Sequence, residues 1–155
     1  MQVMEANGTL QSLGHNLGQQ NYDGPIVILV DKLSASASEI LAGVIQDYDR
    51  GLVIGSQTFG KGTVQRMIEL SHGHLKFTEQ KYYRVSGEST QNKGVEPDIT
   101  IPLVFNDEEI GERSYENSLP YNHIDPIFYR SFNKVENVDL LKTISSNRTN
   151  SNEMS

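Results

Sequence analysis

The sequence predicts an α/β fold in which a parallel strand–helix–strand unit is followed by antiparallel strands. A continuous apolar and β-branched run at 26–30, bounded by a Gly-Pro pair and an aspartate, is typical of a short buried strand. Helical periodicity extends over 39–48, and a second short apolar run occupies 52–54. Because a crossover helix joins strands that run in the same direction, this order favours a parallel pair with a right-handed connection.

The helix of this unit is predicted to begin at a serine and to end before a glycine. Ser36 and Glu39 match the S-x-x-E capping box, and Gly51 is the candidate residue just past the C-terminal cap. The side chains expected to face the core form one helical stripe, made of Ile40, Leu41, Val44, Ile45 and Tyr48.

Strand periodicity replaces helical periodicity after the second strand. Apolar and polar residues alternate over 64–70, residues 71–74 indicate a hairpin tip, and 75–85 is expected to return antiparallel. A polar loop, 87–94, then leads to a last short strand at 99–102. The antiparallel strands are therefore expected to extend the parallel core.

The apolar residues gather in the middle of the chain, so three regions are expected. The 155 residues, 36% of them hydrophobic, suit one domain with its core in residues 24–105. Residues 1–23 are a polar lead-in that is expected to be partly disordered, and 106–155 are a polar extension. The last roughly ten residues have low complexity and are predicted to be disordered.

Composition excludes several classes of function. The net charge is −7 and no cluster of Lys and Arg exists, which argues against a nucleic-acid partner. The absence of cysteine excludes disulfides, thiolate zinc sites and a cysteine nucleophile. No apolar run is long enough for a transmembrane segment, and the first residues lack the pattern of a signal peptide.

Three serines alternate with alanines directly after the first predicted strand: Ser34, Ser36 and Ser38. A strand-to-helix turn holds a hydroxyl rigidly, and the free N–H groups of the helix start favour a developing oxyanion. Such a position therefore suits a nucleophilic serine. Ordinary helix capping uses serine for the same geometric reasons, and composition alone does not choose between the two interpretations.

Lys61 lies between two glycines, and two interpretations compete with that of an ordinary solvated loop lysine. Gly55 to Lys61 match G-x-x-x-x-G-K, most of a phosphate-binding P-loop. Gly62 stands where the magnesium-binding Ser or Thr should be, and a strand pattern follows where a P-loop needs a helix. The other interpretation is a lysine base, since desolvation favours the neutral amine that can take a serine proton.

The histidines suggest no convincing site. His72 and His74 could share one metal ion, but no third ligand is near them in sequence and they lie at the predicted hairpin tip. A Ser/His/Asp triad is possible in principle with these two, His15 or His123, and none has supporting context. Neither a metal ion nor a cofactor is predicted.

Two motifs together resemble the carboxy-terminal processing (tail-specific) serine proteases. S-A-S-A-S-E at Ser34–Glu39 and T-F-G-K-G-T-V-Q at Thr58–Gln65 follow the family pattern, with a helix between them. Lys81–Pro102 is similar to the downstream strand of the family and its G-V-x-P-D motif. The resemblance is greatest to the bacterial periplasmic tail-specific subgroup and covers roughly residues 20–130.

The resemblance implies roles for five residues and a fold. Ser36 is expected to be the nucleophile, Lys61 the general base and Gln65 the residue that orients the lysine amine. Ala37 is expected to offer its backbone N–H to the oxyanion, and Asp47 a structural or supporting role. The implied fold is part of a crotonase-like (ClpP/crotonase-type) core.

The resemblance also implies a function, which is hydrolysis of proteins from unstructured C-terminal tails through an acyl-enzyme, in the periplasm or cell envelope. The PDZ domain and the upstream core segments of the family have no counterpart in this sequence. We therefore expect a truncated fragment that carries the dyad and need not cleave proteins alone. One alternative is a non-catalytic interaction module that retains the fold, and a less favoured one is a P-loop-like nucleotide binder.

Overall fold

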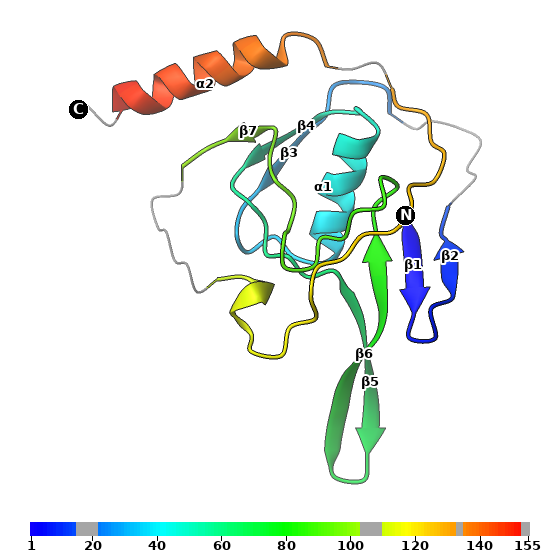
Figure 1. Cartoon of the computed structure of the whole chain (residues 1–155). Helices are drawn as coiled ribbons and strands as arrows, with labels where there is room; N and C mark the ends of the chain where they lie inside the picture. Colours follow the sequence, from blue (N-terminus) through cyan, green and yellow to red (C-terminus); the bar gives the residue numbers. More distant parts are fainter. Residues whose placement is uncertain (15–21, 103–109, 133–134, 153–155) are drawn as a thin grey trace.

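The computed structural model describes residues 1–14, 22–102, 110–132 and 135–152. A parallel sheet, with strand order β3-β4-β7, carries helix α1 on one face (Figure 1). Its strands are β3 (Val27–Val30), β4 (Leu52–Gly55) and β7 (Ile99–Thr100), and α1 spans Ala37–Asp47. The predicted strand–helix–strand unit is confirmed, because β3 and β4 pair in parallel along their full length.

The core of this unit is built from small side chains. Val30, Ala42, Val53 and Val95 form a buried cluster between α1 and the parallel sheet. Leu41, which the predicted stripe included, is 53% exposed, so that part of the prediction is wrong. The buried residues of α1 are Glu39, Ala42, Gly43 and Ile45, so Ile45 of the predicted stripe does face the interior.

Helix α1 ends differently from the sequence prediction. The capping box at Ser36 and Glu39 is present, but the residue past the C-terminal cap is Asp49, with φ of 51°, and not Gly51. The N–H groups of Asp49 and Arg50 both donate back to carbonyls of the last helical turn at 2.9 Å. This is a Schellman arrangement, in which an aspartate takes the left-handed position that glycine usually fills.

Strand β3 was expected to be buried on both faces, and it is not. Val27 is 54% exposed and Leu29 is 76% exposed, so only the alternate side chains of the strand enter the core. Helix α2 (Val138–Asn152) partly covers this second face of the sheet: its Leu141 and Ile144 line a cavity together with Val27. Strand β3 lies at the edge of the sheet, and a single helix on each face covers it only in part, so two of its side chains stay exposed.

The second sheet is antiparallel, with strand order β2-β1-β6-β5. It consists of β1 (Gln2–Glu5), β2 (Leu10–Ser12), β5 (Thr63–Leu70) and β6 (Gly73–Tyr83). The predicted hairpin is confirmed as β5–β6, which projects from the body of the protein (Figure 1).

Both segments for which disorder is predicted contain regular elements where the structure describes them, and the disorder itself stays a prediction. The polar lead-in forms β1 and β2, and β1 pairs with the inner end of β6 while Val3 is buried. The C-terminal segment is helical as far as Asn152 in α2. His15 and residues 153–155 lie outside the described residues, and the division at 24–105 stays a prediction. None of the helices described here is both long and apolar enough to cross a bilayer.

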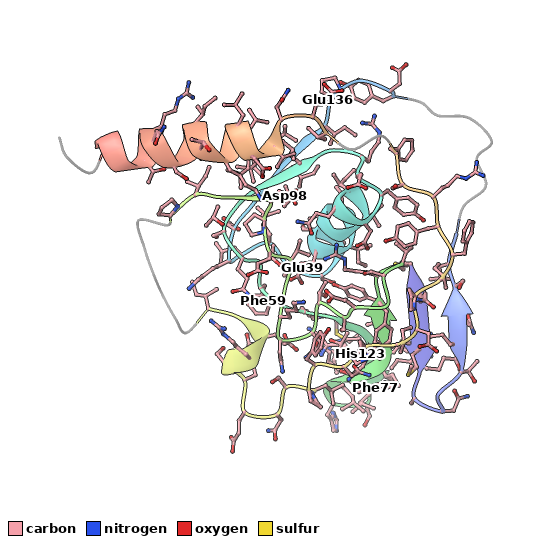
Figure 2. All side chains as sticks on the ribbon, turned by 45° about the horizontal axis from the view of Figure 1, so that its top comes forward. Glu39, Phe59, Phe77, Asp98, His123 and Glu136 are labelled. Carbon is pink, nitrogen blue, oxygen red and sulfur yellow. The ribbon has the colours of Figure 1, made fainter. Side chains whose placement is uncertain are left out.

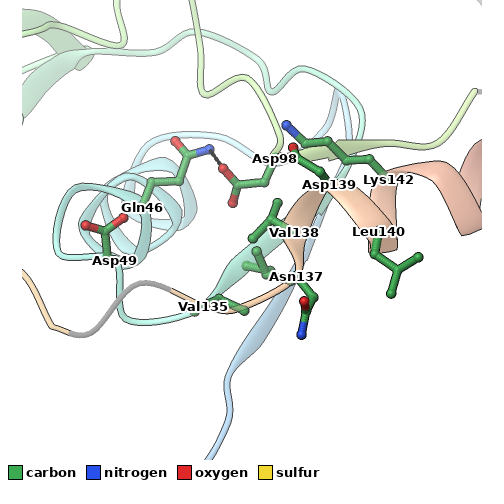
Figure 3. Close-up of a pocket in the computed structure, with 11 residues that line it drawn as sticks. Gln46, Asp49, Asp98, Val135, Asn137, Val138, Asp139, Leu140 and Lys142 are labelled. Carbon is green, nitrogen blue, oxygen red and sulfur yellow. Dashed lines mark hydrogen bonds between the residues drawn. The ribbon is translucent and has the colours of Figure 1, made fainter.

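A cavity of about 670 Å³ lies where α1, β4 and the start of α2 meet (Figure 3). Asp98 lines it, from the motif G-V-E-P-D, and accepts hydrogen bonds from the Val53 N–H (2.8 Å) and the Gln46 amide (3.1 Å). Asp98 therefore ties the helix to the sheet. None of the five residues assigned catalytic or supporting roles lines this cavity, so its size does not make it the candidate site.

Candidate active site

Ser36 holds an unusual backbone conformation at the start of α1. Its φ of 55° and ψ of −110° lie in a region that side chains with a Cβ rarely adopt. Its neighbours in the serine cluster are ordinary: the Ser34 hydroxyl closes a turn with the Asp31 carboxylate at 3.0 Å, and Ser38 lies within α1. The structure therefore distinguishes Ser36 from the other two serines, which composition did not.

This conformation leads to a prediction about stability. We expect Ser36→Gly to have a free energy of unfolding about 1 kcal/mol higher than Ser36→Ala, because glycine adopts a positive φ without strain. Ser38 is the matched control, since at a regular helical position alanine should instead be the more stable by about 0.5–1 kcal/mol. Urea unfolding of the four variants measures both differences. An alanine at 36 that is as stable as the glycine would contradict the strain.

Lys61 lies in a short segment without regular structure that ends where β5 begins at Thr63. We call residues 60–62 of this segment the lysine turn. The segment after the lysine is thus a strand and not a helix, which removes the structural basis of the P-loop alternative. Gly60 has a φ of +93°, and a Cβ at Gly62 would lie 2.6 Å from the backbone nitrogen of Gln91. Both glycines flanking the lysine are therefore required by the turn itself.

Glu39 joins the serine and lysine segments, and sequence analysis assigned it only a capping role. Its side chain is fully buried, and Figure 2 shows it in the interior beside the loop that carries Phe59. One carboxylate oxygen accepts the backbone N–H groups of both Ser36 (2.8 Å) and Lys61 (2.9 Å). The other accepts the Gly60 N–H (2.7 Å) and the Thr58 hydroxyl (2.6 Å).

These four hydrogen bonds hold together two segments that are 25 positions apart in sequence. The backbone nitrogens of Ser36 and Lys61 are close in space, because both donate to the same oxygen of Glu39. A further hydrogen bond between the two segments runs from the Phe59 N–H to the Ser34 carbonyl at 3.0 Å. The S-x-x-E pattern could reveal the capping box, but nothing local indicates that the same carboxylate serves a distant loop.

Tyr82 bridges the same two segments through their carbonyl groups, whereas Glu39 binds their N–H groups. Its hydroxyl lies 2.9 Å from the Lys61 carbonyl and 3.3 Å from the Ser36 carbonyl, and it accepts a hydrogen bond from Thr90 at 2.7 Å. Burial raises the pKa of Tyr82 well above its ordinary value, so the hydroxyl stays protonated as a donor. The N–H groups of the two segments are thus bound by a carboxylate, and their carbonyls by a phenol.

The side chain of Lys61 is directed into a cavity of about 520 Å³ that Gln65 also lines. Its amine donates to the Thr63 carbonyl at 3.1 Å; among the described residues no hydrogen bond joins it to the Ser36 hydroxyl or to Gln65. Lys61 precedes β5 and a bulge lies between Val64 and Gln65, so the two residues do not lie on one regular strand. The two side chains nevertheless meet at one cavity.

The remaining two predicted residues differ in their surroundings. Ala37 is exposed in the first turn of α1, and its N–H donates no hydrogen bond within the part of the chain that the structure describes. That N–H is therefore open to a ligand. Asp47 instead forms a buried bidentate pair with Arg84, at 2.6 and 3.0 Å, which joins the end of α1 to the segment after β6.

The polar segment 87–94, predicted as a loop, contributes the floor of the lysine turn. Ser89, Thr90 and Gln91 are all buried, and Gln91 accepts the Gly62 N–H at 2.9 Å. Polar residues usually indicate an exposed loop. Here they are buried because they bond to a turn some thirty residues away, which sequence periodicity does not reveal. No local signal could have identified this segment.

Two family models match the chain. Residues 2–101 match Peptidase family S41, and residues 105–154 match the C-terminal domain of tail specific protease. The Tail-specific protease of Haemophilus influenzae is 38% identical over 148 residues, covering 90% of this chain and 21% of that protein. The Carboxy-terminal-processing protease of Bartonella bacilliformis is 48% identical over 86 residues, covering 55% of this chain and 20% of that protein.

A solved structure, that of mature CPAF, matches with a TM-score of 0.50 and 28% identity over 57% of this chain and 17% of that chain. The chain thus spans about a fifth of the length of the curated relatives it matches. The region of the S41 match includes Ser36, Lys61 and the strands of both sheets. The chain therefore belongs to peptidase family S41.

Proposed function

We propose that Ser36 and Lys61 form the catalytic dyad of a serine endopeptidase that processes proteins at unstructured C-terminal tails. The observation that carries the proposal is the shared anchoring of the two residues: one oxygen of Glu39 accepts both backbone N–H groups. Family membership and the names of the relatives support the reaction class. The Ser36 conformation supports the choice of nucleophile, because strained backbone gathers at functional sites.

In the proposed reaction, the Ser36 oxygen forms a bond to the carbonyl carbon of the scissile peptide, and its proton passes to the Nζ atom of Lys61. The peptide C–N bond then breaks, and the leaving amine takes that proton, which leaves an ester on Ser36. Water hydrolyses the ester with Lys61 again as the base. Gln65 is assigned the orientation of the amine, and the free N–H of Ala37 is one donor to the oxyanion.

Several wider features belong to the same proposal. The fold is part of a crotonase-like core. The protein acts in the periplasm or cell envelope, and a PDZ domain, such as the family resemblance implies, captures the substrate. No cofactor takes part in the proposed reaction. The supporting observation for the fold is the mixed α/β arrangement shared with mature CPAF.

The test is covalent labelling of the Ser36 oxygen and not protein cleavage, since four fifths of the relatives' length lies outside the matched region. A fluorophosphonate forms an oxygen–phosphorus bond with an activated serine and releases fluoride. We expect the 155-residue chain to gain one label at Ser36, located by peptide mass spectrometry. Lys61→Met should lower the rate by about 10²-fold or more, the usual contribution of a general base.

Ser34→Ala and Ser38→Ala are the matched controls, and both should label at the wild-type rate. Labelling that survives Ser36→Ala, or a rate unaffected by Lys61→Met, would overturn the dyad. In that case the non-catalytic interaction module becomes the better description of the chain.

A further inference from the structure

The backbone of the lysine turn is hydrogen-bonded at every N–H and C=O from residue 60 to residue 62. Glu39 accepts the first two N–H groups, while residues 82–92 satisfy the remaining N–H and all three carbonyls. In that second group the partner of the Gly62 N–H is a side chain, the amide oxygen of Gln91, at 2.9 Å. The position of the turn on this side therefore depends on how Gln91 is held.

Gln91 is fully buried, and three neighbours determine which way its amide points. The Gly62 N–H can only donate, so the amide oxygen must face it. The amide nitrogen is 3.4 Å from a carboxylate oxygen of Glu112 and 3.5 Å from the amide oxygen of Asn92, and both of these oxygens can only accept. The three contacts are consistent with a single orientation of the amide. The reverse orientation would place a donor against the Gly62 N–H and an acceptor against the two accepting oxygens.

Glu112 belongs to the segment that matches the C-terminal domain of tail specific protease. This segment docks directly on the lysine turn: the Glu112 N–H donates to the Phe59 carbonyl at 2.9 Å, and the rings of Tyr115 and Phe59 have centroids 6.4 Å apart. Glu112 and Tyr115 also line the cavity that Lys61 enters. The C-terminal segment is thus part of the surroundings of the lysine.

We infer that Gln91 is a positioning residue for Lys61 and that Glu112, from the C-terminal segment, orients it. The inference rests on the proposed function of Lys61 as the base. Gln91 does not touch the reacting atoms; it fixes the residue after Lys61, and with it the direction in which the lysine side chain leaves the turn. Rates fall steeply when a catalytic group is displaced by about 1 Å, so the loss of this hydrogen bond should be visible in kinetics.

The experiment compares three variants of the full chain. Gln91→Leu keeps the volume and removes the acceptor for Gly62. The exchange Gln91→Glu with Glu112→Gln restores the pattern, because a carboxylate at 91 still accepts from Gly62 and an amide at 112 donates to it. Gln2→Leu is the matched control, since Gln2 is also buried and its amide nitrogen bonds two backbone carbonyls, those of Arg84 and Asp125.

We expect Gln91→Leu to slow fluorophosphonate labelling of Ser36 by about 10–100-fold. The exchange variant should recover most of the rate, and Gln2→Leu should label at the wild-type rate. In ¹⁵N–¹H spectra Gln91→Leu should shift the Gly62 amide signal and accelerate its hydrogen exchange, and the exchange variant should reverse both effects.

The two hypotheses fail in different ways. Absence of labelling in the wild-type chain would count against the dyad, and the Gly62 amide signal would still test Gln91. Wild-type labelling in Gln91→Leu, or an unchanged Gly62 signal in that variant, would overturn the role of Gln91. Equal slowing in Gln91→Leu and Gln2→Leu would show a general loss of folding and would overturn it as well.

Discussion

Replacing Glu39 with leucine is expected to lower the free energy of unfolding by about 4 kcal/mol or more. The carboxylate accepts four hydrogen bonds in the interior, and its loss leaves three N–H groups and the hydroxyl proton of Thr58 without an acceptor. Each buried donor left unpaired costs about 1–3 kcal/mol. Urea unfolding followed by circular dichroism measures the change, and the same variant should lose the labelling of Ser36.

Glu39→Gln separates the shape of the side chain from its charge. The amide keeps one acceptor oxygen and turns an NH₂ group toward the other donors, so we expect an intermediate loss of about 2 kcal/mol. Glu96 is exposed and serves as the control, since Glu96→Gln should change stability by no more than about 0.5 kcal/mol. If Glu39→Leu were as stable as the wild type, the cost of burying the carboxylate would outweigh its four hydrogen bonds.

Asp47→Ala is expected to destabilise the protein by about 3–5 kcal/mol, because it leaves the Arg84 guanidinium buried without its counter-charge. The two side chains are only 6% and 14% exposed, and two hydrogen bonds join them. Replacing both, as Asp47→Leu with Arg84→Met, should recover much of the loss, since a packed apolar pair replaces a buried ion pair at little cost. Urea unfolding of the single and double variants measures the coupling.

The pair Arg66–Glu79 is the control, because it has a similar separation of 3.2 Å but side chains that are 61% and 43% exposed. Glu79→Ala should therefore cost less than about 1 kcal/mol. The comparison also bears on the role of Asp47. If the double variant folds stably and labels Ser36 at the wild-type rate, Asp47 is structural; a stable double variant that does not label would assign it a part in catalysis.

Sequence patterns predicted the parts of the fold that depend on local periodicity. The parallel pairing of β3 and β4, helix α1 and the β5–β6 hairpin all follow from the spacing of apolar residues. The capping box at Ser36 was visible for the same reason, because both of its members lie within one helical turn.

The features that were missed depend on partners far away in sequence. Asp49 ends α1 because the chain turns back onto the sheet there, and the polar lead-in forms β1 because the inner end of β6 offers it a partner. Gln91 is buried for a similar reason, since the lysine turn supplies a donor for it. In each case a tertiary contact outweighs the local tendency of the residue type.

The pairing of β1 with β6 has a consequence for the order in which the chain folds. Gln2 pairs with Tyr83, so some eighty residues must leave the ribosome before the first strand finds its neighbour. The parallel unit closes earlier, because its two longer strands and helix α1 all lie between Val27 and Gly55. Among the strand pairs described here, β1 and β6 are the farthest apart in sequence, so β1 waits longest for its partner during synthesis. In that interval one edge of β1 is unpaired, and nascent chains are then most exposed to misassociation.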